Sequence, residues 1–350
     1  MFKIIPYKNN IIKKARSIRY AMQKLNIMEY PFFLVIDAEN KVIGSITDGD
    51  IRRAILKGLD IDSSVINCMN KKPKIANLQN KSSYDKVLKN IKTFRKFAPV
   101  IDSKKKIKFI IVEDLPSKKS IALIMAGGYG KRLGKMTAQT PKPLLKLGKR
   151  SILEDIIKKL ENAKYTNIFI STYYLHQKIE NFVKKRRSKS NIQILKENVP
   201  LGTAGSIYLI KNEEFEALTV INGDIISDIN LDALDNFHRD KKNDITVSVA
   251  DYSHTIPFGV IEFDKNHLYK KLEEKPILRK FILSGIYCLD KSVCNLVENK
   301  FLDMPDLIKN SSKLGKRIGV FPIYEYWNDI GTPHKFSLEK NRQKIKNNKN

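Results

Sequence analysis

Hydrophobic and polar positions follow two different patterns along the chain. From residue 121 onward, short apolar runs such as Ile121–Met125 alternate with stretches such as Ile152–Leu160, whose apolar positions recur at helical spacing. An alternation of strands and helices predicts an α/β domain with a parallel sheet and helices on both faces. Before residue 115, paired strand patterns joined by polar turns predominate.

The first 115 residues contain a repeat with a shift of 65 residues. Each copy has a helical pattern followed by strand, polar turn and strand. The first copy consists of Ala15–Leu25, Val35–Asp37 and Val42–Thr47, and the second of Ser83–Phe94, Val100–Asp102 and Ile107–Val112. The first copy continues as a helix with an acidic first turn and a glycine stop at Gly58.

The remaining elements give the domain organisation. We predict a repeat unit at residues 1–115, a linker at 116–120, an α/β domain at 121–340 and a basic tail at 341–350. Predicted strands are Asn167–Thr172, Asn191–Leu195, Leu218–Asn222 and Asp244–Ala250, and the shorter Gly259–Phe263, Leu268–Glu273 and Ile282–Leu289 are typical of a substrate-side extension. Predicted helices are His176–Lys185, a stretch ending near Ile210, Leu231–His238 and a basic segment from Lys335.

Composition narrows the class of protein. The net charge of +28 suits either nucleic-acid binding or a lysine-rich surface that attracts anionic substrates. No nucleic-acid motif accompanies the charge, so we favour the second interpretation. No run approaches the roughly 18 apolar residues that span a bilayer, and the start has no secretion signal. Three cysteines without metal-ligand spacing fit a reducing cytoplasm. We therefore expect a cytoplasmic protein without nucleic-acid or membrane partners.

The most informative stretch joins an apolar strand to a glycine-rich turn, Ala126-Gly127-Gly128-Tyr129-Gly130, followed by Lys131 and Arg132. Glycines allow backbone N–H groups to approach a ligand closely. Lys142 follows between two prolines. Strand, glycine loop and three cations together indicate a polyphosphate site. The sequence lacks both the P-loop pattern and the ribose-binding acid of dinucleotide enzymes.

A carboxylate also follows a later strand. Asp224 comes just after the apolar run that ends at Asn222, where an acid beside a phosphate loop can hold Mg²⁺. The alternative is an ordinary turn or helix-capping aspartate.

With these motifs in this order, residues 121–340 resemble the sugar-1-phosphate nucleotidyltransferases, Rossmann-like enzymes that make nucleotide sugars from an NTP and a hexose-1-phosphate. The resemblance implies that Arg132 and Lys142 are catalytic and that Asp224 and Asp329 hold Mg²⁺. It implies nucleotide contacts from Ala126, Gly127, Gly128, Gly130, Lys131, Glu197, Gly202 and Thr203. It implies sugar-phosphate contacts from Gly259, Glu274, Lys275 and Gly285. For Lys131 a solvated loop lysine is an equal alternative.

Glu197 bears on the choice of base. In the resembled family, a side chain five residues before the loop glycine (here Gly202) reads the base. A carboxylate only accepts hydrogen bonds, and guanine offers two adjacent donors on its Watson–Crick edge, so Glu197 favours GTP. Backbone contacts can also select the base, which leaves a uridylyltransferase open.

The segment Gly44–Gly58 resembles a CBS domain, so the first 115 residues resemble a tandem CBS pair with β-α-β-β-α copies. The resemblance implies an adenosine-type nucleotide held by Thr47 and Asp50. The second copy has Val112 and Leu115 at these positions and lacks the pair. An architectural or dimerising role, with Thr47 as a helix cap, is the alternative.

The combination of a CBS-like pair with a nucleotidyltransferase-like domain resembles the guanylyltransferases of bacterial legionaminic acid pathways, which act on glucosamine-1-phosphate. This similarity implies GTP as the nucleotide, and we also expect a homo-oligomer. Alternatives are a mannose-1-phosphate guanylyltransferase, a uridylyltransferase, or a non-catalytic nucleotide sensor. The intact Arg132, Lys142, Asp224 and Asp329 argue against the sensor.

Overall fold

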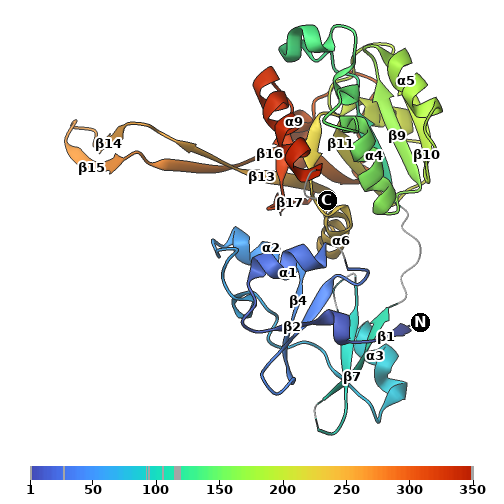
Figure 1. Ribbon diagram of the computed structural model, residues 1–350, viewed down its shortest axis with the longest axis vertical. Coiled ribbons are helices and arrows are strands. Elements are labelled where there is room, and N and C mark those ends of the chain that lie inside the picture. The colour runs from blue at the N-terminus through green and yellow to red at the C-terminus, as the bar shows by residue number, and fades with distance from the viewer. Residues whose placement is uncertain are drawn as a thin grey trace. The chain divides into compact units, whose positions relative to one another are not determined.

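The computed structural model describes residues 2–26, 28–91, 93, 95–104, 106–113 and 120–347, with side chains to 345 (Figure 1). Contacts divide the chain into two compact units. The first comprises Met1–Lys119 and Asn230–Asn243, and the second Ser120–Ile229 and Asp244–Asn350. The expected linker at 116–120, apart from Ser120, and the repeat position Leu115 lie outside the described residues, as does the end of the expected tail at 348–350.

The first unit is built from the predicted repeat. Its elements are β1 (Phe2–Ile5), β2 (Ile11–Lys13), α1 (Ile18–Leu25), β3 (Phe32–Ile36), β4 (Val42–Thr47), α2 (Asp48–Leu56), β5 (Ala76–Asn77), α3 (Tyr84–Lys89), β6 (Phe97–Ile101), β7 (Ile107–Glu113) and α6 (Leu231–Lys241). Strands form two sheets, β2-β3-β4 and β1-β7-β6-β5. The strand pairs β3/β4 and β6/β7 have register breaks at Val35/Ile36 and Val100/Ile101, 65 residues apart.

The turns of the two copies are equivalent in detail. Asp37 Oδ1 accepts the backbone N–H of Lys41 at 2.9 Å, and Asp102 Oδ1 accepts that of Lys106 at 2.9 Å. A short polar side chain thus closes each strand–turn–strand unit. The rings of Phe32 and Phe97 stack with centroids 3.7 Å apart. The predicted repeat is confirmed as a structural repeat.

The helices of the first unit are shorter than their sequence patterns. Helix α1 begins at Ile18 because Ser17 caps it by accepting the N–H of Tyr20. Helix α3 ends at Lys89, and the expected end at Phe94 lies outside the described residues. The residues described after β7 include no counterpart of α2 within the second copy.

The second unit contains a seven-stranded sheet with helices on both faces. Its elements are β8 (Ser120–Met125), α4 (Ile152–Asn162), β9 (Asn167–Thr172), α5 (His176–Lys184), β10 (Asn191–Lys196), β11 (Ala217–Asn222), β12 (Ile225–Ser227), β13 (Ile245–Thr255), β14 (Gly259–Phe263), β15 (Tyr269–Glu274), β16 (Ile277–Asp290), α7 (Lys291–Cys294), α8 (Met304–Lys313), β17 (Ile318–Ile323), β18 (Trp327–Asp329) and α9 (Pro333–Asn347). The strand order is β10-β9-β8-β11-β16-β13-β17.

The expectation of a parallel sheet is only partly correct. Strands β10, β9, β8 and β11 are parallel, but β16 runs antiparallel between β11 and β13. A buried antiparallel strand in a sheet covered on both faces has the same continuous apolar pattern as a parallel one. The hydrophobic pattern therefore predicted where the strands lie, but it did not show whether they run parallel or antiparallel.

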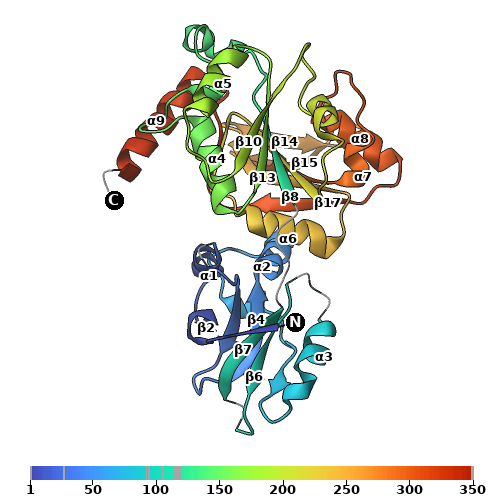
Figure 2. The same cartoon turned by 90° about the vertical axis from the view of Figure 1, so that its right-hand side faces the viewer.

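Two apolar layers enclose this sheet, with α4 and α5 on one side and α7 and α8 on the other (Figure 2). On the α7–α8 side, side chains such as Leu123, Val220 and Tyr287 pack with Val293 and Met304. The predicted helix near Ile210 is a 3-10 helix, Gly205–Ile210, on the same side. No helix among the residues the structure describes has the length and hydrophobicity needed to cross a bilayer.

Two strands are much longer than predicted. Strand β13 has 11 residues and β16 has 14, and they stay paired from Val249–Leu283 to Thr255–Ile277. Strands β14 and β15 continue this ribbon as a hairpin. We call residues 251–283 the arm, which projects from the sheet in Figure 1. The short strands expected at Asp244–Ala250 and Ile282–Leu289 are thus the bases of one long ribbon.

Candidate active site

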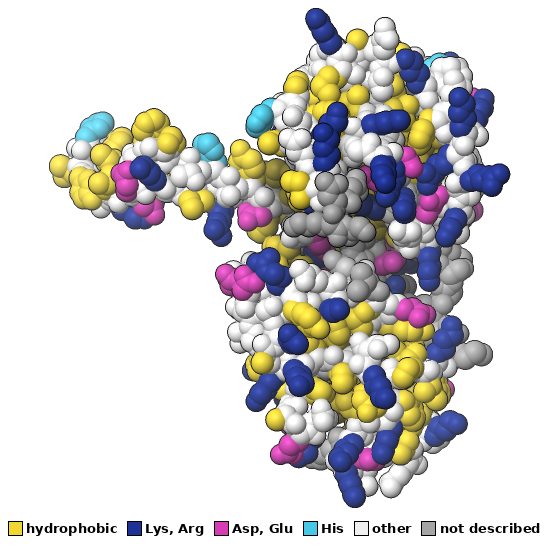
Figure 3. Space-filling view, viewed as in Figure 1, with side chains coloured by type: hydrophobic (Ala, Val, Ile, Leu, Met, Phe, Trp, Pro, Cys, Tyr) yellow, Lys and Arg dark blue, Asp and Glu magenta, His cyan; other side chains and the backbone are white. Residues whose placement is uncertain are grey.

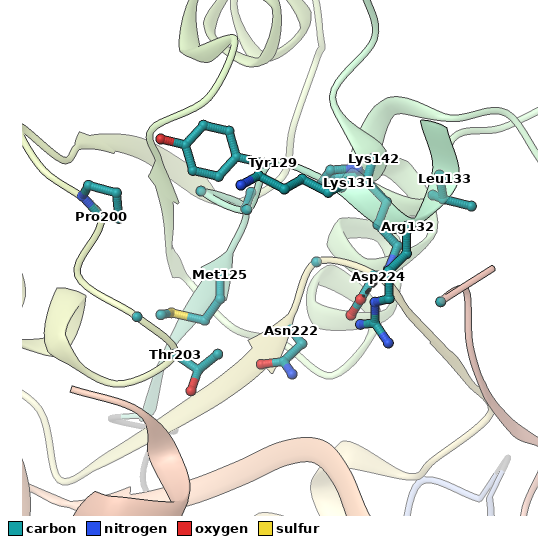
Figure 4. Close-up of a pocket in the computed structure, with 18 of the residues that line it drawn as sticks. Met125, Tyr129, Lys131, Arg132, Leu133, Lys142, Pro200, Thr203, Asn222 and Asp224 are labelled. Carbon is teal, nitrogen blue, oxygen red and sulfur yellow. Dashed lines mark hydrogen bonds and ion pairs between the residues drawn. The ribbon is translucent and has the colours of Figure 1, made fainter. Parts of the chain in front are cut away.

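A pocket of about 350 Å³ opens where two neighbouring parallel strands end (Figure 4). Met125 at the end of β8 pairs with Asn222 at the end of β11, and both line the pocket. The carboxyl ends of parallel strands are the usual position for ligands in such sheets. In Figure 4, Arg132, Lys142 and Asp224 lie on one side and Pro200 and Thr203 on the other.

The glycine loop forms one wall of this pocket. Ala126, Gly127, Gly128, Gly130 and the side chain of Lys131 all line it. Gly130 has a φ of 67°, and a Cβ there would lie 2.9 Å from Thr137 Cγ2. The hydroxyl of Thr137 donates to the Gly130 carbonyl at 2.9 Å and fixes the turn. Only a glycine fits this left-handed, crowded position without strain.

Aromatic side chains flank the loop. Lys131 Nζ lies 5.3 Å from the ring centroid of Tyr129, a cation–π distance. Tyr129 meets Tyr173 edge to face with centroids 5.8 Å apart, and its hydroxyl raises the pKa of Tyr173. Lys131 is thus an exposed cation held at the pocket by a ring. Its ring contact fits either of the two roles considered from the sequence.

Lys142 and Asp224 both line the pocket and contact each other. Lys142 is 9% exposed, and its Nζ lies 2.5 Å from Asp224 Oδ2. Gly223 makes this approach possible, since a Cβ there would lie 2.8 Å from Met125 O and 3.0 Å from Pro143 Cγ. The prolines around Lys142 and the glycine before Asp224 therefore hold an ammonium and a carboxylate in contact.

The second predicted metal carboxylate reaches the same region from another segment. Strands β12 and β18 pair, with Ile225 opposite Asp329. The N–H of Ile330 donates to Asp224 O at 3.2 Å. A Cβ on Gly331 would lie 3.2 Å from Asp329 Oδ2 and 3.6 Å from Arg132 Nη1. Arg132 and Asp329 thus converge on Gly331, which lines the pocket.

The donor set at this position suits a hard cation. Carboxylates are the protein ligands that Mg²⁺ prefers, and it normally keeps several waters and substrate oxygens besides one or two of them. Asp224 and Asp329 each contact a lysine, Lys142 and Lys335 respectively. No cluster of three or more His, Cys, Asp or Glu side chains occurs within the described ranges. Two carboxylates fit a cation whose other ligands come from phosphate and water.

Glu197 lies beneath the glycine loop and is 5% exposed. Its Oε1 accepts the hydroxyl of Ser171, and its Oε2 accepts the N–H of Leu201 at 2.9 Å. A Cβ on Gly127 would lie 3.0 Å from Oε1, so the glycine leaves this oxygen uncovered toward the pocket. A carboxylate oxygen has a second lone pair, so Oε1 can still accept a hydrogen bond from a ligand.

Gly202 and Thr203 line the pocket beyond Glu197. Gly202 has a φ of 76°, and a Cβ there would lie 2.6 Å from Leu302 O. The N–H and hydroxyl of Thr203 both donate to Asp303 Oδ1 at 3.0 Å. The Thr203 hydroxyl also accepts the N–H of Met304. Thr203 therefore ties the loop to the start of α8.

The four predicted sugar-phosphate residues are separated in the structure. Gly285, with a φ of 76°, packs against Asn222, since a Cβ there would lie 2.8 Å from Asn222 Nδ2. Gly259, Glu274 and Lys275 lie in the arm, and no arm residue lines the pocket. The structure brings Gly285 against Asn222, which lines the pocket, and leaves the other three outside the pocket.

In the first unit, Thr47 and Asp50 form the cap of α2. The Thr47 hydroxyl donates to Asp50 Oδ2 at 2.7 Å, and Asp50 Oδ2 also accepts the Thr47 N–H at 2.9 Å. Asp50 Oδ1 lies 2.5 Å from Arg53 Nη2. Both side chains thus have the capping role that was the alternative to ligand binding.

Sequence reasoning missed three polar residues at the pocket. Ser171 and Asp303 position Glu197 and Thr203, and the buried Oδ1 of Asn222 has no hydrogen-bond partner among the described residues. Ser171 and Asn222 lie on strands that read as apolar runs, so only their place at the carboxyl end of a strand hinted at a site. Asp303 is 100 residues from Thr203, and no local pattern connects them.

Known proteins are similar to this chain over about three fifths of its length. The mannose-1-phosphate guanylyltransferase catalytic subunit beta of Drosophila pseudoobscura pseudoobscura is 29% identical over 222 residues, 61% of this chain and 60% of that protein. The bifunctional protein GlmU of Methanocaldococcus jannaschii is 31% identical over 239 residues, 64% and 56% of the two chains. The chain thus spans about three fifths of the length of these curated relatives.

Solved structures share the fold. The crystal structure of HddC from Yersinia pseudotuberculosis complexed with GMP-PN has a TM-score of 0.51 and 23% sequence identity, and the match covers 64% of this chain and 99% of that one. The likeness supports the Rossmann-like α/β fold of the second unit. A model of the family described as nucleotidyl transferase matches residues 121–346. Since that match covers well over half of the sequence, the chain belongs to the nucleotidyl transferase family.

Proposed function

We propose that this protein transfers a guanylyl group from GTP to a hexose-1-phosphate, giving a GDP-sugar and pyrophosphate. Family membership and the guanylyltransferases among the relatives support the reaction class. The clustering of Arg132, Lys142 and Asp224 around a glycine loop supports a site for anionic substrates. These residues also disfavour the sensor alternative, which has no need for a complete phosphate site.

The chemistry follows from the charges. An oxygen of the sugar phosphate forms a bond to the α-phosphorus of GTP, and the bond from that phosphorus to the bridging oxygen of pyrophosphate breaks. The nucleophile is already ionised, so no general base is needed. Arg132 stabilises the charge that develops on the departing pyrophosphate, while Lys142 neutralises the α-phosphate and the incoming sugar phosphate. Backbone N–H groups of the glycine loop add fixed dipoles.

Mg²⁺ would bind Asp224 and Asp329. The ion supplies electrostatic neutralisation of the triphosphate. Asp224 Oδ2 lies 2.5 Å from the ammonium of Lys142. A cation on Asp224 would compete for this carboxylate and leave Lys142 to contact phosphate oxygens. Asp224 therefore both positions the lysine and holds the metal in this proposal.

The observation that carries the choice of GTP is the fixed carboxylate of Glu197. Ser171 and the Leu201 N–H hold it, and Gly127 leaves one oxygen facing the pocket. A fixed carboxylate oxygen, which only accepts hydrogen bonds, suits the edge of guanine that carries two adjacent donors, whereas uracil and thymine present one donor between two acceptors. Buried polar groups that a wrong base leaves unpaired give strong discrimination.

Turnover of the four NTPs by the wild type and by Glu197→Gln tests this choice. We expect the wild type to prefer GTP and the variant to lose at least about tenfold of that preference, because an amide presents a donor to a guanine donor. Glu214→Gln, on an exposed segment, is the matched control. A wild-type preference for UTP, CTP or TTP would contradict the guanylyl assignment and leave the transfer reaction intact.

A separate choice concerns the sugar phosphate that accepts the guanylyl group. Glucosamine-1-phosphate rests on the resemblance to guanylyltransferases of legionaminic acid pathways, and relatives named for mannose-1-phosphate support the alternative. The same assay with glucosamine-1-phosphate and mannose-1-phosphate as acceptors separates the two.

A second candidate function concerns the first unit. A cavity of about 520 Å³ lies along α2, lined by Asp50, Arg53, Lys57, Gly58 and Cys68, among others. Two cations beside a cavity of this size suit an anionic ligand. This supports a nucleotide at a CBS pair, although the atoms of Thr47 that would bind it already cap α2.

A further inference from the structure

The arm concentrates the exposed apolar side chains of the protein. Of the 24 large hydrophobic side chains that are exposed within the described ranges, 11 lie in the arm. Phe258 is 71% exposed, Tyr269 68% and Leu268 64%. Figure 3 shows apolar side chains distributed along the arm, with charged and other polar groups between them. Because nearly half of the exposed large apolar side chains of the described residues lie on this one projecting segment, the arm indicates an interaction surface.

The arm also lacks the support that a ribbon needs. Strand β17 pairs with β13 only as far as Ala250, and β11 pairs with β16 only from Ile286 onward. Between these points and the tip, the two chain segments pair only with each other among the described residues. An isolated two-stranded ribbon is marginally stable in water, and its free edges readily pair or pack with another chain.

A kink in the middle of the arm presents two charges. Lys275 has a φ of 49°, and its N–H donates to Phe258 O at 3.3 Å. Pro276 follows it. A Cβ on Gly259 would lie 3.0 Å from Glu274 Oε2, so the glycine makes room for this carboxylate. A left-handed lysine is uncommon, and such strain persists where a function requires it.

The pocket has apolar and polar groups that an additional wall could cover. Its rim carries exposed apolar side chains, Phe301 at 61% and Tyr129 at 43%. Its floor contains Asn222 Oδ1, which is buried and has no hydrogen-bond partner in the described part of the chain. At about 350 Å³ the pocket is at the small end of ligand cavities, yet two substrates must bind there. An additional wall with apolar and charged groups would complete it.

We propose that the arm of one copy covers the pocket of a second copy, so that Glu274 and Lys275 act on the partner's substrates. Every copy carries both the arm and the pocket, and a twofold axis exchanges them reciprocally. The chain carries a net charge of +28, but the arm has five acidic and six basic side chains and avoids most of the repulsion between copies. The ribbon leads away from its own sheet, which disfavours closure onto its own pocket.

The chemical role of the arm rests on the proposed function. Lys275 would contact the phosphate of the incoming sugar phosphate, and Glu274 would accept hydrogen bonds from its hydroxyl groups. Both would then be contributed to the site by the other copy. The dimer itself requires no substrate, so its test is independent of the proposed reaction.

The first experiment measures mass in solution by light scattering and sedimentation, with no substrate present. We expect the wild type to be a dimer and Phe263→Ser/Tyr269→Ser, a cross-strand pair near the tip, to be a monomer. Leu314→Ser/Leu338→Ser changes two side chains of similar exposure outside the arm and should remain a dimer. A monomeric wild type, or a dimer that survives the arm substitutions, would overturn the proposal.

The second experiment mixes two inactive variants, Lys142→Ala and Lys275→Ala, by refolding or coexpression. If the arm acts between copies, the mixture should regain about a quarter of wild-type turnover. Half of the randomly paired dimers are then mixed, and one of the two sites in each mixed dimer is intact. Action within one copy restores none, and that result with dimers intact would overturn the shared site. Absence of turnover in the wild type would refute the proposed function. The mass measurement would still show whether the arm forms the dimer.

Discussion

Individual side chains in the pocket have roles that their neighbours define. Arg132 converges with Asp329 on Gly331, whereas the adjacent Lys131 contacts the ring of Tyr129, and both cations are exposed. Lys142 is buried against Asp224. Two neighbouring cations in one loop thus have different neighbours, and of the two Arg132 is the one that lies near Gly331 with Asp329. Their position after the same glycine turn does not separate them, and only the family resemblance marked Arg132 as catalytic and left the role of Lys131 open.

This difference gives a prediction for the two cations. Arg132→Ala should lower kcat by about 10²–10³, the usual loss when one charge-stabilising group is removed from a reaction centre. Lys131→Ala should change kcat by less than about tenfold and act mainly on the KM for the NTP. Steady-state kinetics with saturating sugar phosphate measures both. Equal losses of kcat in the two variants would show that Lys131 also acts in the transition state.

At the scale of elements, one aspartate joins three strands of the large sheet. Asp244 precedes β13, and its Oδ2 accepts the N–H of Arg317, before β17, at 2.8 Å. Its Oδ1 lies 3.2 Å from Lys316 Nζ, and its carbonyl accepts the N–H of Asp290 at the end of β16. Burial raises the pKa of the Asp244 carboxyl, but the Arg317 N–H and Lys316 outweigh burial and leave the pKa below its ordinary value.

The lowered pKa makes the stability of the second unit depend on pH. A carboxyl with a lower pKa in the folded state stabilises the fold above its unfolded pKa of about 3.9, and this contribution disappears as pH falls through the folded value. Asp244→Asn should therefore lower the free energy of unfolding by about 2 kcal/mol at pH 7 and by much less near pH 2. Urea unfolding followed by the fluorescence of Trp327, the single tryptophan, measures this unit.

The exposed Asp306→Asn is the control for that measurement, since its carboxylate only faces Lys309 at 3.5 Å on the surface. It should change stability little at either pH. A destabilisation by Asp244→Asn that stays constant down to pH 2 would mean that packing, and not the charge, holds the three strands.

At the scale of the whole molecule, a repeat unit and a nucleotidyl transferase unit share one chain. The repeat has a full β-α-β-β-α copy only in its first half within the described residues, and the cavity lies along α2 of that copy. Arg53 and Lys57 are one helical turn apart and both line the cavity. One anionic ligand per chain is therefore the expectation for this unit.

Calorimetry on the full chain tests that expectation with AMP, ADP and ATP. Binding should be seen with the wild type and weaken about tenfold or more in Arg53→Ala/Lys57→Ala, because both cations face the cavity. Lys74→Ala, an exposed lysine outside the cavity, should bind as the wild type does. No heat with any of the three nucleotides would favour the architectural role of the repeat.

The sequence by itself determined much of the local structure and pointed to the glycine-loop and charged residues that line the pocket. Apolar runs, glycine turns and proline-flanked Lys142 are local signals, and most strands of the second unit begin and end within a residue or two of their patterns. The 65-residue repeat was equally clear, since its turns use the same aspartate-based closure. Such features depend on backbone propensity and burial, which neighbouring residues in the chain decide.

Only the tertiary structure decided what distant segments do to one another. In the folded chain, β16 runs antiparallel to β11, and Thr203 forms hydrogen bonds with Asp303, 100 residues away. Strands β13 and β16 extend into an arm, so Glu274 and Lys275 lie outside the pocket. Strand direction, long-range hydrogen bonds and the path of a ribbon leave no local pattern, because they depend on which surfaces meet after the chain has folded.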